Sequence, residues 1–499
     1  MKARPLKPAT ARTQWGNHFD HVQRIVLCTP KQPRVQHLLL KFNGTGSQTR
    51  RFLMALSKEV THRPSHRKLT GPQLSIGFTY RGLEALKLPL RVLLVLQKLA
   101  PSFHLGAPVQ AATRLGDTGS SAPDRWDSGF QLEALHAVIS LHHEDDAAVA
   151  ALLKRVRGLA KGYAVQIDAT VPRGRNFSLT PGKPDERWVH FGYRDGLSKV
   201  GIRGWSHDPD IPPETEKTLL PLSTHHAGEF LLGHPDDSGA NPWALAAQPQ
   251  AVRSFFCEAS FGVLRQMEQD EPAFRAYLKK RATWIAKGSR GTIDEKTASE
   301  LVQAKLCGRF FDGRRIDPLT QAPTGEPGED FDYTSDPEGK GCPFGAHIRR
   351  MNPRGGQIAH QLRRRPLLRR GAPYGDPWNE SEASGIERGL LGLFFCSSIE
   401  NQFEHLLGEW ADRVPMGNLD EGRAKDPLAS HHEDPDASFV LPGDAMKRGG
   451  VTEFKGLKPF VRTRGTAYLL YPTSDGLEQL ATEDHGHLWV DEVDREAFE

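Results

Sequence analysis

The sequence predicts an α+β fold made of two similar halves, each an antiparallel β-sheet with helices packed on it. Two observations predict it: β-α-β patterning occurs twice in the first half, and the same pattern returns with longer insertions in the second half. Two successive β-α-β units can interleave into one antiparallel sheet with both helices on one face, the ferredoxin-like arrangement. No short tandem repeat is visible, so the duplication is one of topology only.

The first half contains apolar runs with the periods of helices and strands. Asp145–Lys161 is predicted to be a helix because its apolar residues recur at helical spacing. Tyr163–Ala169 alternates between apolar and other residues, as a strand does. The other elements predicted here are strands over Val35–Phe42, Leu74–Tyr80 and His136–Leu141 and a helix over Thr49–Val60.

The second half repeats this order between long loops. Its predicted elements are strands over Ser260–Met267, Gly389–Ser397 and Gly465–Tyr471, helices over Pro272–Thr283 and Asp294–Cys307, and a helix face marked by Ile399, Phe403, Leu407 and Trp410. Turn-forming residues are dense in Asp208–Glu216. We therefore place an N-terminal domain at 1–215 and a C-terminal domain at 216–499. Loops as long as Asp317–Gly345 and Arg413–Gly456 usually have a function or are disordered.

Composition excludes several classes of protein. The 499 residues include 65 Lys and Arg against 61 Asp and Glu, so the net charge of +4 gives no sign of a polyelectrolyte partner. The longest strongly apolar stretch, Gly389–Ile399, is much shorter than the roughly twenty residues of a membrane-spanning helix. Met1–Gln14 lacks the apolar region of a secretory signal. We expect a cytoplasmic protein with no membrane partner, whose five cysteines are buried or bystander thiols.

One histidine lies among small and apolar residues in the segment Gly341–Arg354. His347 follows Cys-Pro-Phe-Gly-Ala and precedes three arginines, including Arg349 and Arg354. One interpretation is a core histidine beside a solvated basic loop. The other is a metal or haem ligand whose arginines bind carboxylates such as haem propionates, since imidazole suits iron and arginine suits carboxylates. The residues alone leave both interpretations open.

An aspartate and an arginine run are further candidates. Asp195 stands between Gly192 and Gly196, either as a backbone-bonded turn residue or as a general acid/base in a pocket. Arg363–Arg370 contains five arginines and ends in a turn, so it could be a nucleic-acid or anion-binding patch. No aromatic residue is interleaved with these arginines, which argues against nucleic acid.

Together these segments resemble the dye-decolorizing peroxidase family. The glycine-bracketed Asp195 matches its GxxDG motif, Cys342–Arg349 matches its proximal-histidine motif, and Arg369–Gly375 matches its distal-arginine motif. The order along the chain is also that of the family. The resemblance covers most of the chain, with further similar segments at Gly77–Leu83, Gly228–Gly233 and Ile399–Glu404.

The resemblance implies a duplicated ferredoxin-like fold that binds one haem b, mainly through its C-terminal half. It implies that His347 is the proximal iron ligand, Asp195 the distal acid/base and Arg369 the distal arginine. The other expected haem contacts are Arg349, Arg354 and Gly196. The family also has an acidic or amide partner for the proximal imidazole. Glu400 is one candidate for that partner, although a helix N-terminal capping role is favoured for it.

The implied function is a peroxidase that uses hydrogen peroxide to oxidise organic reductants, such as dyes and phenolics, in one-electron steps. Two alternatives remain: a non-catalytic haem carrier on the same fold, and a nucleic-acid binder that uses Arg363–Arg370. The paired histidines are expected to bind no dedicated metal; they are His142 and His143, His225 and His226, His431 and His432, and His485 and His487. Oligomeric state and the physiological reductant stay open.

Overall fold

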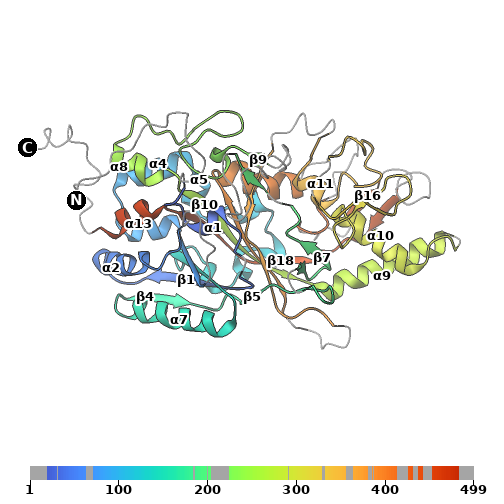
Figure 1. Ribbon diagram of the computed structural model, residues 1–499, viewed down its shortest axis with the longest axis horizontal. Coiled ribbons are helices and arrows are strands. Elements are labelled where there is room, and N and C mark those ends of the chain that lie inside the picture. The colour runs from blue at the N-terminus through green and yellow to red at the C-terminus, as the bar shows by residue number, and fades with distance from the viewer. Residues whose placement is uncertain are drawn as a thin grey trace, which may run out of the picture.

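Ten strands form one sheet at the centre of the molecule, and helices pack on its outside (Figure 1). The long helices α9 (Glu271–Gly288) and α10 (Glu295–Cys307) extend away at the end opposite α2 (Gly46–Ser57). The computed structural model describes residues 19–30, 32–62, 71–183, 186–198, 200–203, 224–289, 291–328, 332–355, 364–379, 385, 387–412, 425–430, 437–441 and 452–482.

The first half has the predicted ferredoxin-like topology. Its strands are antiparallel neighbours in the order β4-β1-β3-β2, and α2 and α7 are its two crossover helices. This order arises because the two β-α-β units interleave. The elements are β1 (Arg34–Phe42), α2 (Gly46–Ser57), β2 (Gln73–Phe78), β3 (Ala137–His143), α7 (Asp146–Lys161) and β4 (Val165–Asp168).

The second half repeats that order with different helices. Strand β10 lies between β18 and β15, and β15 also pairs with the short strands β13 and β14. The helix η7, predicted as an α-helix face, has the wider π-helical turn. The elements are β10 (Ser260–Gln269), β13 (Leu368–Arg369), β14 (Ala372–Tyr374), β15 (Gly389–Cys396), η7 (Ile399–Ala411) and β18 (Val461–Tyr471).

Two short seams join the halves into a closed barrel. At one seam β18 pairs with β2 through Leu470 and Phe78. At the other, β5 (Gly174–Arg175) pairs with both β1 and β14. The α+β class and the duplicated topology are confirmed, and the two predicted sheets are continuous with each other. The predicted domain boundary at 215/216 and the Asp208–Glu216 linker lie outside the described residues.

The remaining elements are short and connect or cover these strands. The helices are α1 (Arg24–Leu27), α3 (Tyr80–Ala85), α4 (Leu90–Leu99), α5 (Pro101–Leu105), α6 (Ala107–Gln110), η1 (Ala111–Leu115), α8 (Gln250–Phe256), α11 (His347–Met351) and α13 (Ser474–Ala481). The strands are β6 (Arg187–Val189), β7 (Tyr193–Asp195), β8 (Gly201–Ile202), β9 (Thr224–His225), β11 (Arg315–Ile316), β12 (Pro323–Thr324), β16 (Ser438–Leu441) and β17 (Thr452–Lys455).

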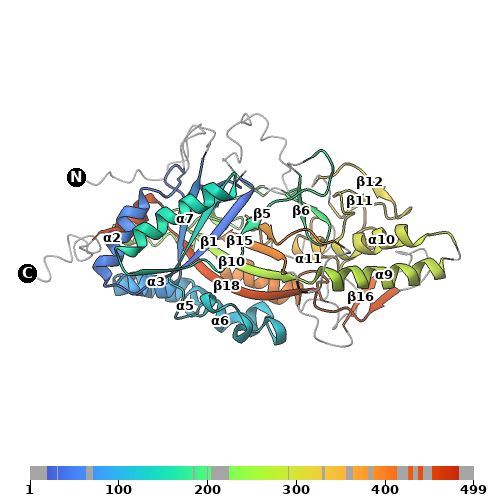
Figure 2. The same cartoon turned by 90° about the horizontal axis from the view of Figure 1, so that it is seen from below.

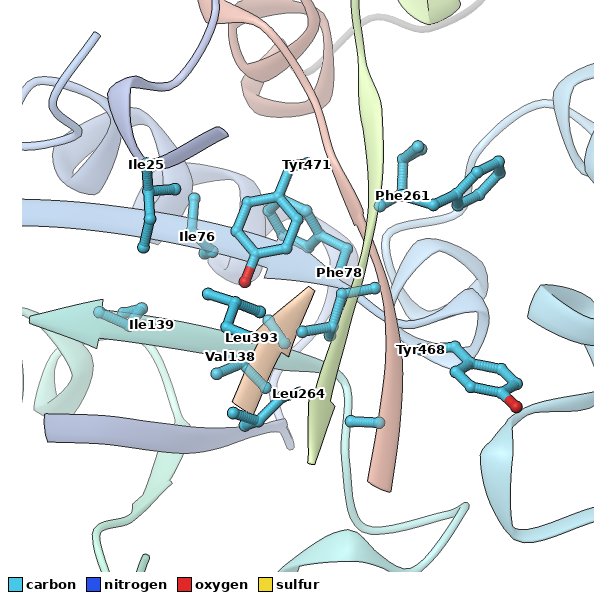
Figure 3. Close-up of a cluster of buried hydrophobic side chains, with 14 of the residues drawn as sticks. Ile25, Ile76, Phe78, Val138, Ile139, Phe261, Leu264, Leu393, Tyr468 and Tyr471 are labelled. Carbon is cyan, nitrogen blue, oxygen red and sulfur yellow. The ribbon is translucent and has the colours of Figure 1, made fainter. Parts of the chain in front are cut away.

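Apolar side chains from both halves meet in the core (Figure 3). The Tyr471 ring of β18 has room there because Gly77 of β2 and Gly262 of β10 lack side chains. A Cβ at either glycine would come within 2.6 Å and 2.5 Å of that ring, respectively. The close packing of the two halves therefore depends on small residues in central strands.

The thiol prediction is confirmed for this part of the chain. All five cysteines are free, and Cys257 alone among them is not fully buried. Among the described helices, none combines the length and apolarity that a bilayer crossing needs.

A buried ion pair fastens the loop after η1 to the barrel. Asp117 accepts two hydrogen bonds of 2.6 and 2.7 Å from Arg265 of β10, and both side chains are almost wholly buried. Asp117→Ala is expected to lower the free energy of unfolding by about 3–5 kcal/mol, because Arg265 is left as an uncompensated buried charge. Chemical denaturation would measure this loss. A change below about 1 kcal/mol, the median for surface pairs, would contradict it.

Candidate active site

His347 is the first residue of α11, and its ring is held by a carboxylate. Its Nδ1 lies 2.9 Å from Oδ2 of Asp426, whose side chain is completely buried. The other Asp426 oxygen accepts the backbone N–H groups of Leu428 and Ala429, each at 2.9 Å. Burial alone would raise the pKa of Asp426, but His347 and these hydrogen bonds outweigh it and hold the pKa below its usual value. The ring is thereby oriented, and Nε2 is the nitrogen left to bind a metal.

Asp426 is the hydrogen-bond partner of the His347 imidazole, which could not be identified from the sequence. It lies in the Arg413–Gly456 loop, and no periodic pattern links that loop to His347. Glu400 is not the partner, which corrects that candidate. Its Oε1 accepts the backbone N–H of Ser102 at 2.7 Å, in the first turn of α5. Its own helix, η7, is capped by Ser398, so the favoured capping role is not observed there, and Glu400 instead binds the start of the neighbouring helix α5.

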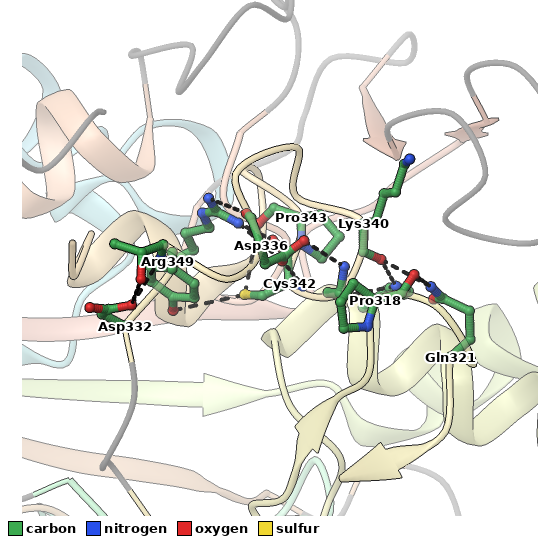
Figure 4. A network of polar contacts seen from close by, with 12 residues as sticks. Pro318, Gln321, Asp332, Asp336, Lys340, Cys342, Pro343 and Arg349 are labelled. Carbon is green, nitrogen blue, oxygen red and sulfur yellow. Dashed lines mark hydrogen bonds and ion pairs between the residues drawn. The ribbon is translucent and has the colours of Figure 1, made fainter. Parts of the chain in front are cut away.

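Arg349 is turned into its own loop. Its guanidinium donates to the carbonyl of Cys342 at 2.7 Å and to the carbonyl of Asp336 at 3.0 Å (Figure 4). It also lies 4.3 Å from the ring centres of both Tyr333 and Phe344. Because the guanidinium of Arg349 donates to these carbonyls and contacts both rings, it holds the segment before His347 in place. This geometry does not fit the predicted contact with a ligand carboxylate.

A buried lysine of α10, Lys305, contacts the same loop. The ammonium of Lys305 donates to the carbonyl of Gly341 at 2.8 Å, and burial lowers its pKa to about 7. The Asp336 carboxylate accepts the backbone N–H groups of Gly341 and Cys342 at 3.1 and 2.8 Å. These contacts fix the loop that enters α11, and with it the position of the His347 backbone.

Asp195 ends strand β7, and its side chain is exposed. It stands opposite Arg187 in the β6–β7 hairpin, so both side chains point to the same face. Burial lowers the pKa of Arg187, while the Asp195 carboxylate opposes that shift. Gly192 and Gly196 both have a positive φ, +75° and +76°, a conformation that glycine adopts without strain. The two glycines therefore set the turns on either side of Asp195.

Arg369 ends β13 and Arg370 follows it, and the two side chains point in opposite directions. Arg370 is buried and donates to the carbonyls of Ile25 and Val26 at 2.7 and 2.6 Å. Arg369 is exposed and stands opposite Phe394 of β15. Strand geometry alternates the two sides, which leaves Arg369 as the arginine able to meet a ligand.

The same alternation affects the interpretation of Arg363–Arg370 as a nucleic-acid-binding patch. Arg363 lies outside the described residues, and the guanidinium of Arg370 is committed to buried carbonyls. Arg364 is only partly exposed. The described part of the run therefore does not present one continuous basic face, which a phosphate backbone would need.

Two hydrogen bonds draw the three predicted segments together. His190, five residues before Asp195, has Nε2 2.7 Å from the carbonyl oxygen of Tyr374, in the strand that follows Arg369. Arg354, seven residues after His347, donates to Oγ of Ser198 at 3.3 Å. Figures 1 and 2 likewise show the β6–β7 hairpin beside α11. The aspartate, arginine and histidine segments thus border one site.

Three arginines gather at this border. Arg354 is buried, and its charge lowers the pKa values of Arg309 and Arg364 beyond the lowering that burial causes. Grouped guanidinium groups favour an anionic ligand, and their planar donors suit carboxylates in particular. The donor set therefore fits a group that combines a metal for His347 with carboxylates for the arginines, as haem does.

Burial and hydrogen bonding describe two of the paired histidines. Burial lowers the pKa of His142 to about 3, and His225 is hydrogen-bonded to Asp237 at 2.5 Å. His431, His432, His485 and His487 lie outside the described residues. The described ranges hold no cluster of three or more potential metal-binding His, Cys, Asp and Glu side chains.

A duplicated α+β barrel with a carboxylate-bound histidine, bordered by the segments of Asp195 and Arg369, resembles the barrels of solved dye-decolorizing peroxidases. The family model described as "DyP dimeric alpha+beta barrel domain" matches residues 43–172. The dye-decolorizing peroxidase msp1 of Mycetinis scorodonius is 27% identical over 398 residues, covering 75% of this chain and 70% of that protein. The multifunctional dye peroxidase DyP2 of an Amycolatopsis species is 28% identical over 415 residues, covering 79% and 81%.

Solved structures agree on the fold. An ancestral D-type dye decolorizing peroxidase superposes with a TM-score of 0.74 and 23% identity, over 94% of this chain and all of that one. The family model, the relatives and the solved structures all indicate the dye-decolorizing peroxidase family. The predicted resemblance to that family is confirmed, and these findings support a peroxidase enzyme.

Proposed function

We propose that this chain is a haem b peroxidase that uses hydrogen peroxide to oxidise dyes and phenolic reductants in one-electron steps. His347 is its proximal iron ligand, and Asp195 and Arg369 assist cleavage of the O–O bond. The observation that carries the proposal is the buried Asp426 on Nδ1 of His347, at a site bordered by the aspartate and arginine segments.

The residues present would hold haem from two directions. Nε2 of His347 would bind the iron, and the grouped guanidinium groups of Arg354 and Arg364 would bind the propionates. Gly196, with no side chain beside Asp195, leaves room for a flat group. When bound, haem supplies an iron that accepts oxidising equivalents from peroxide and passes them on one electron at a time.

Asp195 and Arg369 have different roles in the reaction with peroxide. Breaking the O–O bond requires that one oxygen lose a proton and the other gain it. The carboxylate of Asp195 accepts that proton and returns it to the leaving oxygen. The guanidinium of Arg369 stabilises the negative charge that develops on that oxygen, and its positive charge favours the ionised form of a nearby carboxylate.

Two findings about relatives support the class of reductant. The relatives named above are dye peroxidases, and one solved dye-decolorizing peroxidase, 22% identical, was obtained in complex with 2,6-dimethoxyphenol. A haem carrier would have no use for a carboxylate and a guanidinium beside the haem, so the Asp195 and Arg369 segments that border the site favour catalysis over that alternative. We also propose that the protein acts in the cytoplasm, with no nucleic-acid partner.

The direct test is to titrate the haem-free full-length chain with haem and then add peroxide and 2,6-dimethoxyphenol. We expect one haem to bind per chain, with a Soret band, and oxidation that requires peroxide. Haem binding without peroxide turnover would indicate the carrier. Absence of stoichiometric binding would overturn the proposal.

Asp426 provides a finer prediction. Asp426→Ala is expected to reduce haem affinity by roughly 10–100-fold, because second-shell partners orient a metal-binding histidine and raise its basicity. Haem transfer to an acceptor protein would measure the change. Glu258→Ala is a matched control, since Glu258 contacts His234 at 3.0 Å far from α11. An equal loss in both variants would assign the effect to folding, not to the histidine.

A further inference from the structure

A short segment near the N-terminus, residues 25–30, lies beside the strand that carries Arg369. It comprises the last three residues of α1 and the three that follow, and all but one of its residues are buried. Arg370 donates to the carbonyls of Ile25 and Val26 in this 25–30 segment, at 2.7 and 2.6 Å. It also donates to the carbonyl of Arg369 at 2.9 Å. The guanidinium of Arg370 therefore links the backbone of Arg369 to the 25–30 segment.

Arginine suits this position because of the groups that it meets. The last carbonyls of a helix have no partner within the helix, and the planar guanidinium presents several N–H donors at once. Burial, with smaller contributions from the charges of Arg369 and Arg187, lowers the pKa of Arg370 to about 10. The side chain thus stays charged at neutral pH, and its hydrogen bonds to the carbonyls are of the stronger, charge-assisted kind.

The same segment is also linked to the hairpin of Asp195. Arg187 stands opposite Asp195 in that hairpin, and it donates to the carbonyl of Pro30 at 2.9 Å. Only four residues separate Pro30 from Val26, the nearer of the two carbonyls that Arg370 binds. Even a fully extended chain would place these positions at most about 14 Å apart. The strands that carry Asp195 and Arg369 therefore share one short support.

The 25–30 segment is itself fixed to the barrel. Gln23, just before it, donates from its side-chain amide to the carbonyls of Ile76 and Pro472 at 2.8 and 2.9 Å. The amide oxygen accepts the backbone N–H of Ile76 at 2.9 Å. Ile76 belongs to β2 and Pro472 follows β18, the two strands of one barrel seam. Ile25 also packs in the core with Ile76 (Figure 3), so the support cannot simply follow the two arginines.

We propose that Arg370 and Arg187 are positioning residues that fix the separation of Arg369 and Asp195 through the 25–30 segment. This inference rests on the proposed roles of Asp195 and Arg369. Proton transfer and charge stabilisation act on the same peroxide molecule, so the carboxylate and the guanidinium have to keep one separation. A displacement of about 1 Å at a reacting group can cost roughly 100-fold in rate. Arg370 exerts its effect through backbone carbonyls and not through contact with peroxide.

The test measures the reaction of peroxide with the haem-loaded variants Arg370→Lys and Arg187→Lys. Lysine keeps the charge but lacks the planar set of donors, so the carbonyl contacts are loosened while the charge is retained. We expect kcat/KM for peroxide, per bound haem, to fall by roughly 10–100-fold in each variant. Haem affinity should stay close to that of the unaltered protein. The double variant Arg187→Lys/Arg370→Lys should lose little more than either single variant, because both changes act on one separation.

The matched control is Arg50→Lys, which alters another arginine that donates to a backbone carbonyl. Arg50 lies on α2 and donates to the carbonyl of Leu86 at 3.3 Å, and its variant should react with peroxide at the normal rate. A lower melting temperature or weaker haem binding without a slower peroxide reaction would show a purely structural role and overturn the inference. Losses that multiply in the double variant would also overturn it.

The variant Asp195→Asn separates a failure of this inference from a failure of the proposed function. Normal peroxide kinetics in Asp195→Asn would remove the proposed role of that carboxylate. Slow kinetics in Asp195→Asn, together with normal kinetics in both lysine variants, would overturn the positioning role alone. Circular dichroism melts would show that each variant folds. Arg187 is partly exposed, so Arg187→Lys decides the question by itself if Arg370→Lys does not fold.

Discussion

The variant His347→Ala is expected to lose haem, and with it the Soret band and all peroxide turnover. Under the proposed function the oriented imidazole of His347 binds the iron, and the proposed arginine contacts to propionates cannot replace a metal–nitrogen bond. The loss should exceed the roughly 10–100-fold expected for Asp426→Ala, because the ligand itself is removed. Absorption spectra recorded during haem titration would measure it.

Adding free imidazole to the His347→Ala variant provides a second test of the ligand assignment. It can enter the space left by the His347 side chain and bind the iron in its place, so it should restore part of the Soret band. His143→Ala, at the end of β3, is the matched control and should bind haem normally. A His347→Ala protein whose Soret band is unaltered would contradict the assignment of the ligand.

The second large effect is expected from Asp195→Asn. An amide has nearly the shape of the carboxylate but cannot take up the proton from peroxide, so kcat/KM for peroxide should fall by roughly 10²–10⁴-fold. Haem affinity and the resting spectrum should stay close to those of the unaltered enzyme, because Asp195 does not hold the group. Stopped-flow mixing with peroxide would measure the rate.

Its control is Asp146→Asn, a change at an exposed aspartate of α7 that should leave the rate unchanged. Peroxide kinetics of Asp195→Asn that match those of the control would remove Asp195 from the mechanism. A parallel Arg369→Leu variant would then show whether the guanidinium alone suffices.

The sequence predicted the long elements well because their periodicity reflects burial on one face. The helix over Asp145–Lys161 is observed as Asp146–Lys161, and the strand over Gly389–Ser397 as Gly389–Cys396. Short strands such as β5 and β13, two residues each, carry too few side chains for a period to show. The barrel seams depend on such strands and on backbone pairing, which leaves no pattern in side-chain types.

Candidate site residues could be predicted where a motif surrounds them, and not where only tertiary contact brings them in. Asp195, His347 and Arg369 each stand in a motif, whereas Asp426 comes from a distant loop and Arg187 from the hairpin strand opposite Asp195. The prediction that Arg349 contacts the ligand does not fit the structure, for a related reason. Sequence proximity suggested that Arg349 meets the ligand, but the rings of its own loop enclose it.

The position of β18 in the barrel has a consequence for biosynthesis. This strand joins β10 to β2, yet it is among the last described segments of the chain. Until the ribosome has released it, β2 and β10 each keep an unpaired edge that invites pairing with other chains. Closure of the barrel must therefore follow the synthesis of β18, and premature termination before residue 461 should yield aggregated polypeptide in place of a smaller enzyme.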